Sequence, residues 1–306
     1  MLISLIICTY KRPELLKTCL ACATEVIKSI NGEIIIINDC IEDKVDVIED
    51  HKIHLFNNTS HGLASARNLG AKKAKGDLIL FIDDDIEFTV ENVKNLLELS
   101  LKKPNACFNP NWKYSDEMNK IVRKTQFGRF LINVDLVNYK GWVRELPWQE
   151  NIFRVNKLAG FFMLIPKKIF DLTTGFNTQF INQGTEDDEF CKRLIELNAE
   201  LYVDPSNYVF HNELDRIGLE QRLSRYINGS INRRKAFEMG HKEYEIVYSK
   251  NKKMILKIIS NFKNPLIFFT KIIPNIEFFD KLYYSITHIL IAIAIYEGYT
   301  STEESF

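Results

Sequence analysis

The sequence has no excess of either charge. Its 306 residues include 40 Lys and Arg and 40 Asp and Glu, so the formal net charge is zero. Proteins that bind nucleic acid through its phosphates usually carry a clustered positive excess, so the composition does not favour that function. We also find no internal repeat and no low-complexity segment. With 46% hydrophobic residues, the chain can bury one large core, or one domain with an appendage.

The sequence also lacks the cysteine pattern of a zinc or disulfide framework. Of six cysteines, Cys19 and Cys22 have CxxC spacing, but no second Cys or His pair follows at zinc-ribbon spacing. Both lie in a stretch with helical periodicity, where positions three apart share a face. We interpret them as small core residues. Scattered reduced thiols are typical of a cytosolic protein.

Long uncharged apolar runs are missing as well. Residues 1–10 are apolar, but no basic region precedes them and no small-residue cleavage site follows, so we expect no signal peptide. The nearest approach to a membrane span is residues 282–296, which are too few to cross a bilayer and contain His288. We therefore expect no spanning helix.

The first hundred residues alternate buried-strand and helical patterns. Continuous apolar runs predict strands that are buried on both faces, and the series predicts an open, largely parallel sheet with helices on both faces. Ligands bind such sheets at the carboxyl ends of the strands. The predicted strands are 2–10, 33–39, 52–58 and 77–88, and the predicted helices begin at Pro13 and cover 60–74 and 90–103.

The second half has a different pattern. We expect residues 109–156 to be irregular, and residues from 216 onward to be helical throughout. Between them the sequence predicts a strand at 157–166, short helix 167–173, a loop, an acidic helix starting near Thr185, and two strands at 199–205 and 208–211.

Three adjacent acidic residues lie toward the C-terminal end of the fourth predicted strand. Since alternate residues of a strand face the same way, Asp83 and Asp85 are expected on one side and Asp84 on the other. Two carboxylates together favour Mg²⁺ or Mn²⁺ bound to a diphosphate. The alternative is a solvated strand end, although three adjacent carboxylates repel one another and need a cation or other partners.

A second acidic cluster and a histidine are ambiguous when taken singly. Glu186, Asp187 and Asp188 begin a helix, where the helix dipole alone stabilises acidic residues. A single histidine such as His211 is usually an ordinary surface or core residue. Their order after the strand-end acids is what makes them candidates for function.

Four segments, in this order, resemble family 2 glycosyltransferases of the GT-A fold. They are SLIICTYKRP, EIIIINDC, HGLASARNLGAKKAKGDLILFIDDD and AGFFMLIPKKIFDLTTGFNTQFINQGTEDDEFCKRL. The last is most similar to the galactosyltransferase and chondroitin-polymerase-like branch. The resemblance covers about residues 2–213. It departs from the family pattern at Cys8, at Lys11 and Arg12, and in the turn at Gly175, where one glycine and an acid are missing.

The resemblance implies a fold and a domain division. The fold class is α/β: a GT-A nucleotide-diphospho-sugar transferase with a Rossmann-like, mostly parallel sheet and a C-terminal helical extension. Residues 1–215 would form the glycosyltransferase domain, with a nucleotide-sugar-binding half at 1–110 and an acceptor-side half at 111–215. Residues 216–306 would form the C-terminal helical region.

The resemblance also assigns roles to residues. The nucleotide-sugar-binding residues would be Thr9, Tyr10, Asp39, Arg67, Asp83 and Asp84; the metal ligands would be Asp85 and His211; and the catalytic pair would be Asp187 as base with Glu186 binding the acceptor. The cofactor implied is Mn²⁺, or Mg²⁺, and imidazole suits Mn²⁺ better. Two roles are equally compatible with Trp142 and Trp148, namely stacking on a sugar and packing in the core.

The resulting hypothesis is an inverting, metal-dependent hexosyltransferase. It would move a sugar from a nucleotide-diphospho-sugar, with a UDP-sugar favoured, to a hydroxyl of a glycan or lipid-linked glycan in cell-surface polysaccharide or glycoconjugate synthesis. The alternatives are a non-catalytic sugar-nucleotide-binding protein of the same fold and a nucleotidyltransferase. The latter needs a glycine-rich phosphate loop after the first strand, and CTYKRPELL has no glycine.

The helical region alternates basic and apolar segments. Its aromatic residues, among them Phe268 and Phe278, would either pack on the catalytic domain or lie at a lipid surface with lysines such as Lys252 and Lys257. We expect a cytoplasmic protein with peripheral contact to the inner membrane surface through these helices, and no nucleic-acid partner.

Overall fold

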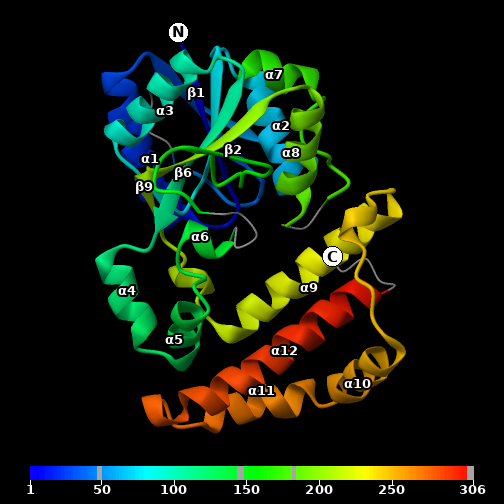
Figure 1. Cartoon of the computed structure of the whole chain (residues 1–306). Helices are drawn as coiled ribbons and strands as arrows, with labels where there is room; N and C mark the ends of the chain where they lie inside the picture. Colours follow the sequence, from blue (N-terminus) through cyan, green and yellow to red (C-terminus); the bar gives the residue numbers. More distant parts are fainter. Residues whose placement is uncertain (47–49, 143–147, 181–183, 302–306) are drawn as a thin grey trace. The chain divides into compact units, whose positions relative to one another are not determined.

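The computed structural model describes residues 1–46, 50–142, 148–180 and 184–301 (Figure 1). The chain divides into two compact units. The first, which we call the sheet unit, contains residues 1–115, 138–181 and 186–212. The second, the helical unit, contains residues 116–137, 182–185 and 213–306.

One mixed sheet forms the centre of the sheet unit. The strand order is β3-β2-β1-β4-β8-β6-β9-β5, with β7 paired to β9. The pairs among β3, β2, β1 and β4, and the pair β6–β9, are parallel; β8 runs antiparallel to both β4 and β6. The strands are β1 (Ile3–Thr9), β2 (Gly32–Asn38), β3 (Ile53–Asn57), β4 (Leu78–Asp83), β5 (Ile86–Glu87), β6 (Ala106–Lys113), β7 (Phe153–Val155), β8 (Phe162–Pro166) and β9 (Glu200–His211).

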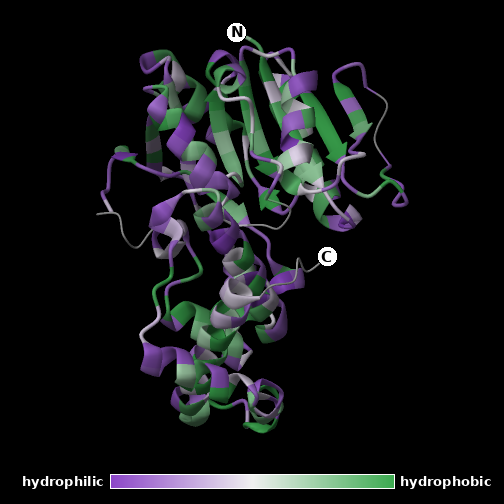
Figure 2. Cartoon of the chain, turned by 90° about the vertical axis from the view of Figure 1, so that its right-hand side faces the viewer, coloured by the Kyte–Doolittle hydropathy of each residue, from purple (hydrophilic) through white to green (hydrophobic). Residues whose placement is uncertain are grey.

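Helices cover both faces of this sheet, and the strands between them are strongly hydrophobic (Figures 1 and 2). Every residue of β1 and β2 is buried, as expected for strands covered on both faces. Pro13 begins α1, and Thr89 caps α3 in a reciprocal pair of hydrogen bonds with Asn92. The helices are α1 (Pro13–Ser29), α2 (Leu63–Lys73), α3 (Val90–Lys102), α6 (Tyr139–Trp142), α7 (Lys167–Leu172) and α8 (Glu186–Glu196). The predicted α/β class with a mostly parallel sheet is confirmed.

The prediction that residues 109–156 are irregular was wrong for the part that the structure describes; residues 143–147 lie outside that part. The described part contains the end of β6, β7 and three short helices, α4 (Asp116–Arg123), α5 (Gln126–Asn133) and α6. Its proline and asparagines argue against a strand at β6, yet Pro110 lies where the register against β9 shifts. A proline is tolerated at such an irregularity because the ladder is already interrupted there. The two strands expected at 199–205 and 208–211 are one strand, β9.

The helices of the helical unit come from two distant parts of the sequence. Its helices are α4, α5, α9 (Leu219–Glu238), α10 (Lys250–Ser260), α11 (Lys263–Ile272) and α12 (Asp280–Thr300), with 3₁₀ turns at Leu214–Arg216, Lys242–Tyr244 and Glu277–Phe279. Residues 116–137 therefore belong to this unit, whereas we had assigned them to the first domain. The C-terminal helical region itself was predicted and is confirmed.

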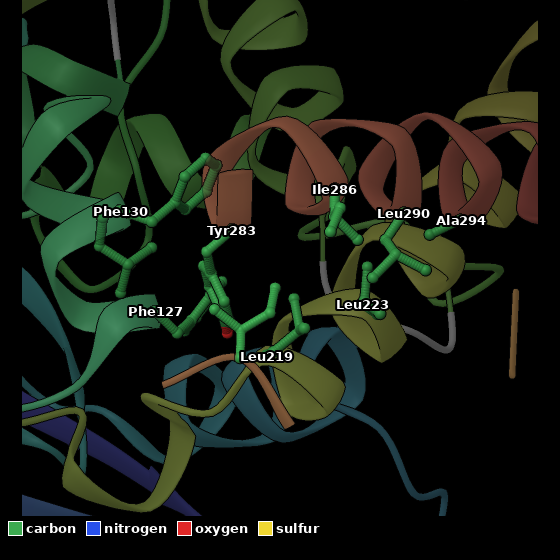
Figure 3. Close-up of a cluster of buried hydrophobic side chains, with 10 residues drawn as sticks. Phe127, Phe130, Leu219, Leu223, Tyr283, Ile286, Leu290 and Ala294 are labelled. Atoms are coloured by element: carbon green, nitrogen blue, oxygen red, sulfur yellow. The ribbon is translucent and has the colours of Figure 1, made fainter. Parts of the chain in front are cut away.

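A cluster of buried apolar side chains holds these helices together (Figure 3). Phe127 and Phe130 of α5 meet Leu219 and Leu223 of α9, and Leu290 of α12 is fully buried among them. Since α5 supplies two of the aromatic rings, the cluster explains why this helix joins the unit.

Among the residues that the structure describes, one helix is long and apolar enough to cross a membrane, although we expected none of that length. It covers residues 277–300, and about 39% of its most apolar part is buried inside the protein. This criterion depends on length and composition alone, and the central helix of a helical bundle meets it too.

We predict that Leu290→Ala destabilises the helical unit by about 2–5 kcal/mol, because it leaves a cavity in a fully buried cluster. Its neighbour Ile289 is 41% exposed, and Ile289→Ala should change stability by about 0.5 kcal/mol or less. Urea unfolding of the full chain measures both. Equal costs for the two variants would contradict this account of the core.

Candidate active site

Parallel pairing brings polar residues from three strands to one edge of the sheet. Thr9 of β1 pairs with Asn38 of β2, and Cys8 pairs with Asp83 at the end of β4. The backbone N–H of Asp39 donates to the carbonyl of Thr9, at 2.9 Å. The carboxyl ends of β1, β2 and β4 therefore meet, as the sequence predicted.

The acidic run after β4 does not lie in one strand. β4 ends at Asp83, a turn follows at Asp84 and Asp85, and β5 begins at Ile86. The predicted alternation of the three carboxylates along a strand was therefore wrong. Asp84 is buried and accepts a hydrogen bond from the Thr9 hydroxyl at 2.7 Å. The turn reflects the different pairing of β5, which leaves β4 and runs antiparallel to β9.

The pairing of β5 with β9 brings Asp85 next to His211. Ile86 lies opposite His211, and the backbone N–H of Asn212 donates to the carbonyl of Asp85 at 2.8 Å. The His211 Nε2 lies 3.2 Å from the Asp85 Oδ1, and both side chains are buried. The two predicted metal ligands, far apart in the sequence, are thus adjacent.

Arg12, one of the departures from the family pattern and not among the predicted site residues, contacts the same turn. Its Nη1 lies 3.1 Å from Asp84 Oδ1 and 3.2 Å from Asp85 Oδ2. Burial raises the pKa of Asp84, while the Arg12 cation and the Thr9 hydroxyl oppose that rise. The sequence held a signal for this contact. Arg12 is a basic residue soon after the first predicted strand, whose carboxyl end was expected near three acidic residues.

Arg67 joins the end of β4 to the start of α8. Its guanidinium is buried and lies 3.1 Å from Asp83 Oδ1 and 2.8 Å from Asp187 Oδ1. Glu186, also buried, lies 3.8 Å from the same group. The sequence suggested a place for Arg67 near the base or diphosphate; in the structure it is a bridge between two predicted site acids.

Asp187 has a second fixed partner. The backbone N–H of Gly160 donates to Asp187 Oδ2 at 2.8 Å. A Cβ on Gly160 would lie 2.4 Å from Arg67 Cζ, so only glycine leaves room for the guanidinium. Burial raises the pKa of Asp187, and the Arg67 cation and the Gly160 N–H act in the opposite direction.

Asn68, next in sequence, is a positioning residue that sequence reasoning missed. Its side-chain amide donates to the Phe176 carbonyl at 2.8 Å and accepts from the Phe176 N–H at 2.7 Å. These two bonds hold the turn at Gly175, whose φ of +85° is a left-handed conformation that favours glycine. The sequence Ala66-Arg67-Asn68 therefore supplies both the buried arginine of the site and the residue that holds this turn.

Asp39 orders the loop before α2. It accepts hydrogen bonds from Asn58 Nδ2 at 2.6 Å and from the Gly62 N–H at 2.9 Å. Gly62 has a φ of +94°, which only glycine adopts readily. Tyr10, the other predicted base-pocket residue, is 53% exposed at the same edge.

Aromatic rings surround His211. The ring centroids of Trp112 and Trp142 lie 5.0 and 5.6 Å from that of His211, and Phe161 stacks on it at 6.3 Å. Trp112 is fully buried, whereas Trp142 is partly exposed. Trp148 contacts Tyr139 and Phe153 instead. Sugar stacking by Trp142 stays a prediction.

The family follows from comparison with known sequences. The model of the glycosyl transferase family 2 matches residues 4–168, which is more than half of the chain, and the N-terminal domain of galactosyltransferase matches residues 147–215. This chain belongs to glycosyl transferase family 2. The predicted family is confirmed, and the second match agrees with the expected likeness of the second half to galactosyltransferases.

The chain is also similar to curated proteins named as glycosyltransferases. An uncharacterized glycosyltransferase of Haemophilus influenzae is 28% identical over 199 residues, which are 64% of this chain and 62% of that protein. Another, from Rickettsia bellii, is 38% identical over 147 residues, 42% of this chain and 21% of its own length. This chain therefore matches less than two thirds of the length of either relative.

Solved structures support the fold. A mannosyltransferase from Pyrobaculum calidifontis, in complex with GDP-Man and Mn²⁺, has a TM-score of 0.53 at 12% identity, with 98% of this chain and 88% of that chain covered. GalNAc-T7 with UDP, GalNAc and Mn²⁺ has a TM-score of 0.50 at 15% identity, covering 76% of this chain and 50% of that one. The predicted GT-A fold is confirmed.

The acidic turn and the end of β9 offer two donors suited to a divalent metal. Asp85 gives carboxylate oxygen and His211 gives imidazole nitrogen, a pair that Mn²⁺ accepts. Within the described ranges, no group of three or more His, Cys, Asp and Glu side chains is arranged around a metal position. A metal here would thus complete its coordination with diphosphate oxygens and water. The chemistry of Asp85 and His211 therefore fits a divalent metal ion.

We predict that Gly160→Ala lowers the free energy of unfolding of the sheet unit by about 3 kcal/mol, because the new methyl group displaces the buried Arg67 from its carboxylates. In an Arg67→Met background the flexible thioether leaves more room, and the same substitution should cost about 1 kcal/mol. A double-mutant cycle followed by urea unfolding measures the difference. Equal costs in both backgrounds would contradict the proposed clash.

Proposed function

We propose that this chain is an inverting, metal-dependent glycosyltransferase. It transfers a sugar from a nucleotide-diphospho-sugar, with a UDP-sugar as the favoured donor, to a hydroxyl of a glycan or lipid-linked glycan acceptor. Family membership supports the reaction class. The proposed mechanism is supported by one observation: the buried guanidinium of Arg67 lies between Asp83 and Asp187. It holds a donor-side acid and a candidate base in one site.

The donor would lie at the carboxyl ends of β1, β2 and β4. Thr9, Tyr10 and Asp39 are proposed to contact the nucleoside, and Asp83 the ribose and sugar phosphate. A divalent metal held by Asp85 and His211 would neutralise charge on the leaving diphosphate. Arg12 lies beside the same carboxylates and is proposed to meet the diphosphate as a second positive group.

Asp187 is proposed as the general base. As a carboxylate it would accept the proton of the acceptor hydroxyl while that oxygen forms a bond to the anomeric carbon and the bond to the diphosphate breaks. A single base and one displacement on the face opposite the leaving group invert the anomeric centre. Gly160 and Arg67 fix both oxygens of this carboxylate, so its orientation is set before substrates bind.

The role of Glu186 is proposed as a contact to the acceptor sugar, as the family resemblance implies. In the structure the side chain is 3% exposed and close to Arg67. We infer that substrate binding has to expose this carboxylate if it touches the acceptor directly. Otherwise it acts through Arg67, as a positioning residue.

Two rival functions make different predictions. A non-catalytic sugar-nucleotide-binding protein would bind the donor without hydrolysing or transferring its sugar. A nucleotidyltransferase would need a glycine-rich phosphate loop after β1, where this chain has Lys11 and Arg12 followed by α1. A cytoplasmic location, and a role in cell-surface polysaccharide or glycoconjugate synthesis, stay predictions.

We predict that Asp187→Asn lowers the transfer rate by about 10²–10⁴-fold, because the amide accepts no proton at neutral pH. The rate is measured as release of the nucleoside diphosphate during sugar-nucleotide hydrolysis or transfer. Asp188→Asn on the next residue is the matched control and should keep most activity. A fully active Asp187→Asn variant would overturn the assigned base.

The pH profile gives a separate test of the same group. The base works when deprotonated, and burial raises the pKa of Asp187, so kcat/KM should fall as pH falls through that raised pKa. Because the Arg67 cation lowers this pKa, Arg67→Met should move the acidic limb to higher pH. A limb that stays in place would show that Arg67 does not act on the base.

Metal and donor class can be read from thermal stability. We predict that UDP-sugars with Mn²⁺ raise the Tm more than GDP- or dTDP-sugars do, and that a chelator removes most of this rise. Asp85→Asn should weaken the Mn²⁺-dependent part of this rise, measured relative to the variant's own Tm without ligands. An identical rise in the presence of the chelator would contradict a metal-bound diphosphate.

A further inference from the structure

Helix α11 presents an exposed apolar stripe. Pro265, Phe268, Phe269 and Ile272 follow the spacing i, i+3, i+4, i+7, which places them on one face of the helix. Phe268 is 64% exposed and Ile272 is 57% exposed. The opposite face, including Ile267, packs on the buried cluster of the helical unit. The exposed face is thus not part of that cluster.

Helix α10 continues this surface. Met254, Ile255 and Ile258 are each more than half exposed, while Leu256 between them is buried. Phe262, in the connection to α11, is 56% exposed. Both α10 and α11 pack on α12, and Figure 1 shows the two helices following each other along it. We call the outward residues of these two helices the α10–α11 surface.

The same segment is strongly basic. Residues 249–276 contain six lysines and no Asp or Glu, although the whole chain is neutral. Lys263 and Lys271 form ion pairs with Glu297 and Glu220. The other lysines, all exposed on α10, are Lys250, Lys252, Lys253 and Lys257. Positive charge is therefore concentrated beside exposed aliphatic and aromatic side chains.

We propose that the α10–α11 surface docks the protein peripherally on a bilayer containing anionic phospholipid. Helices that lie in a membrane interface combine these two features: apolar and aromatic side chains enter the headgroup region, and lysines meet lipid phosphates. Lysine side chains extend their charge into the headgroups while their methylene stems lie on apolar surface. Exposed apolar patches of this kind mark interaction sites.

The positive charge argues against a second copy as the occupant. A twofold interface would bring the same patch of each chain together, so the lysines of the two copies would repel one another. The packing of α12 argues against a spanning helix. Tyr283, Ile286, Leu290 and Ala294 of α12 are buried in the helical unit, and crossing a bilayer would expose them. The proposal rests on this surface alone and not on the proposed activity.

Flotation of the full-length protein with vesicles tests the proposal. We expect it to float with vesicles of phosphatidylcholine and phosphatidylglycerol, and not with phosphatidylcholine alone. Each lysine near an anionic surface contributes roughly fivefold to binding, so reversing Lys252, Lys253 and Lys257 to Glu should weaken it by roughly a hundredfold or more. High salt should weaken binding of the wild type as well.

Matched controls separate this surface from a general effect of charge or apolarity. Reversal of the exposed Lys17, Lys72 and Lys102 in the sheet unit gives the same net charge and should leave binding nearly unchanged. Phe268→Ser with Ile272→Ser should reduce flotation at least tenfold. The control pair Leu101→Ser with Leu172→Ser changes two exposed leucines of the sheet unit and should not reduce flotation. Circular dichroism verifies that each variant is folded.

Several outcomes would overturn the proposal. Wild-type protein that stays unbound to anionic vesicles would overturn it, and so would equal effects of the two triple lysine reversals. Protein that resists extraction by alkaline carbonate would indicate that α12 spans the bilayer instead. A dimer in light scattering that Phe268→Ser and Ile272→Ser dissolve would assign the surface to a second copy.

Discussion

One buried cation organises the site. Arg67 is almost completely removed from water, and a buried charge is stable only when opposite charges and hydrogen-bond acceptors surround it. Asp83 and Asp187 meet that requirement from positions 16 and 120 residues away in the sequence. The space for the guanidinium exists because Gly160 has no side chain. The cation thus fixes the end of β4, the start of α8 and the chain before β8 relative to one another.

A second set of contacts joins strands β5 and β9 at the edge of the sheet to the acidic turn at Asp84 and Asp85, which follows β4. The pairing of β5 with β9 places His211 beside Asp85, and Arg12 contacts that carboxylate from the start of α1. Two basic groups and two acidic groups therefore alternate around the turn. Such an arrangement suits a site that receives a diphosphate with its metal, since the Asp85 carboxylate and the His211 imidazole can bind a cation and Arg12 can meet negative charge. The aromatic rings around His211 limit the access of water to it.

Charge is balanced over the chain but separated within it. Acidic residues gather at the carboxyl edge of the sheet, where they are held by arginines. Lysines gather in α10, beside apolar side chains that the helical unit leaves exposed. A net charge of zero therefore conceals two regions of opposite character, one in each unit. The α10–α11 surface gives the helical unit a proposed role of its own, distinct from chemistry at the sheet edge.

The sequence by itself determined the α/β class, the helical C-terminal region, the family and the meeting of Thr9, Asp39 and Asp83 at one edge. The class and the helical region follow from local periodicity, and the shared edge follows from parallel pairing, which aligns strand ends; the family follows from the resemblance of four motif segments. Only the tertiary structure decided that β4 stops at Asp83, that Arg67 bridges two acids and that residues 116–137 join the helical unit. These depend on contacts between distant segments, on register at Pro110 and on the space at Gly160, which no local pattern encodes.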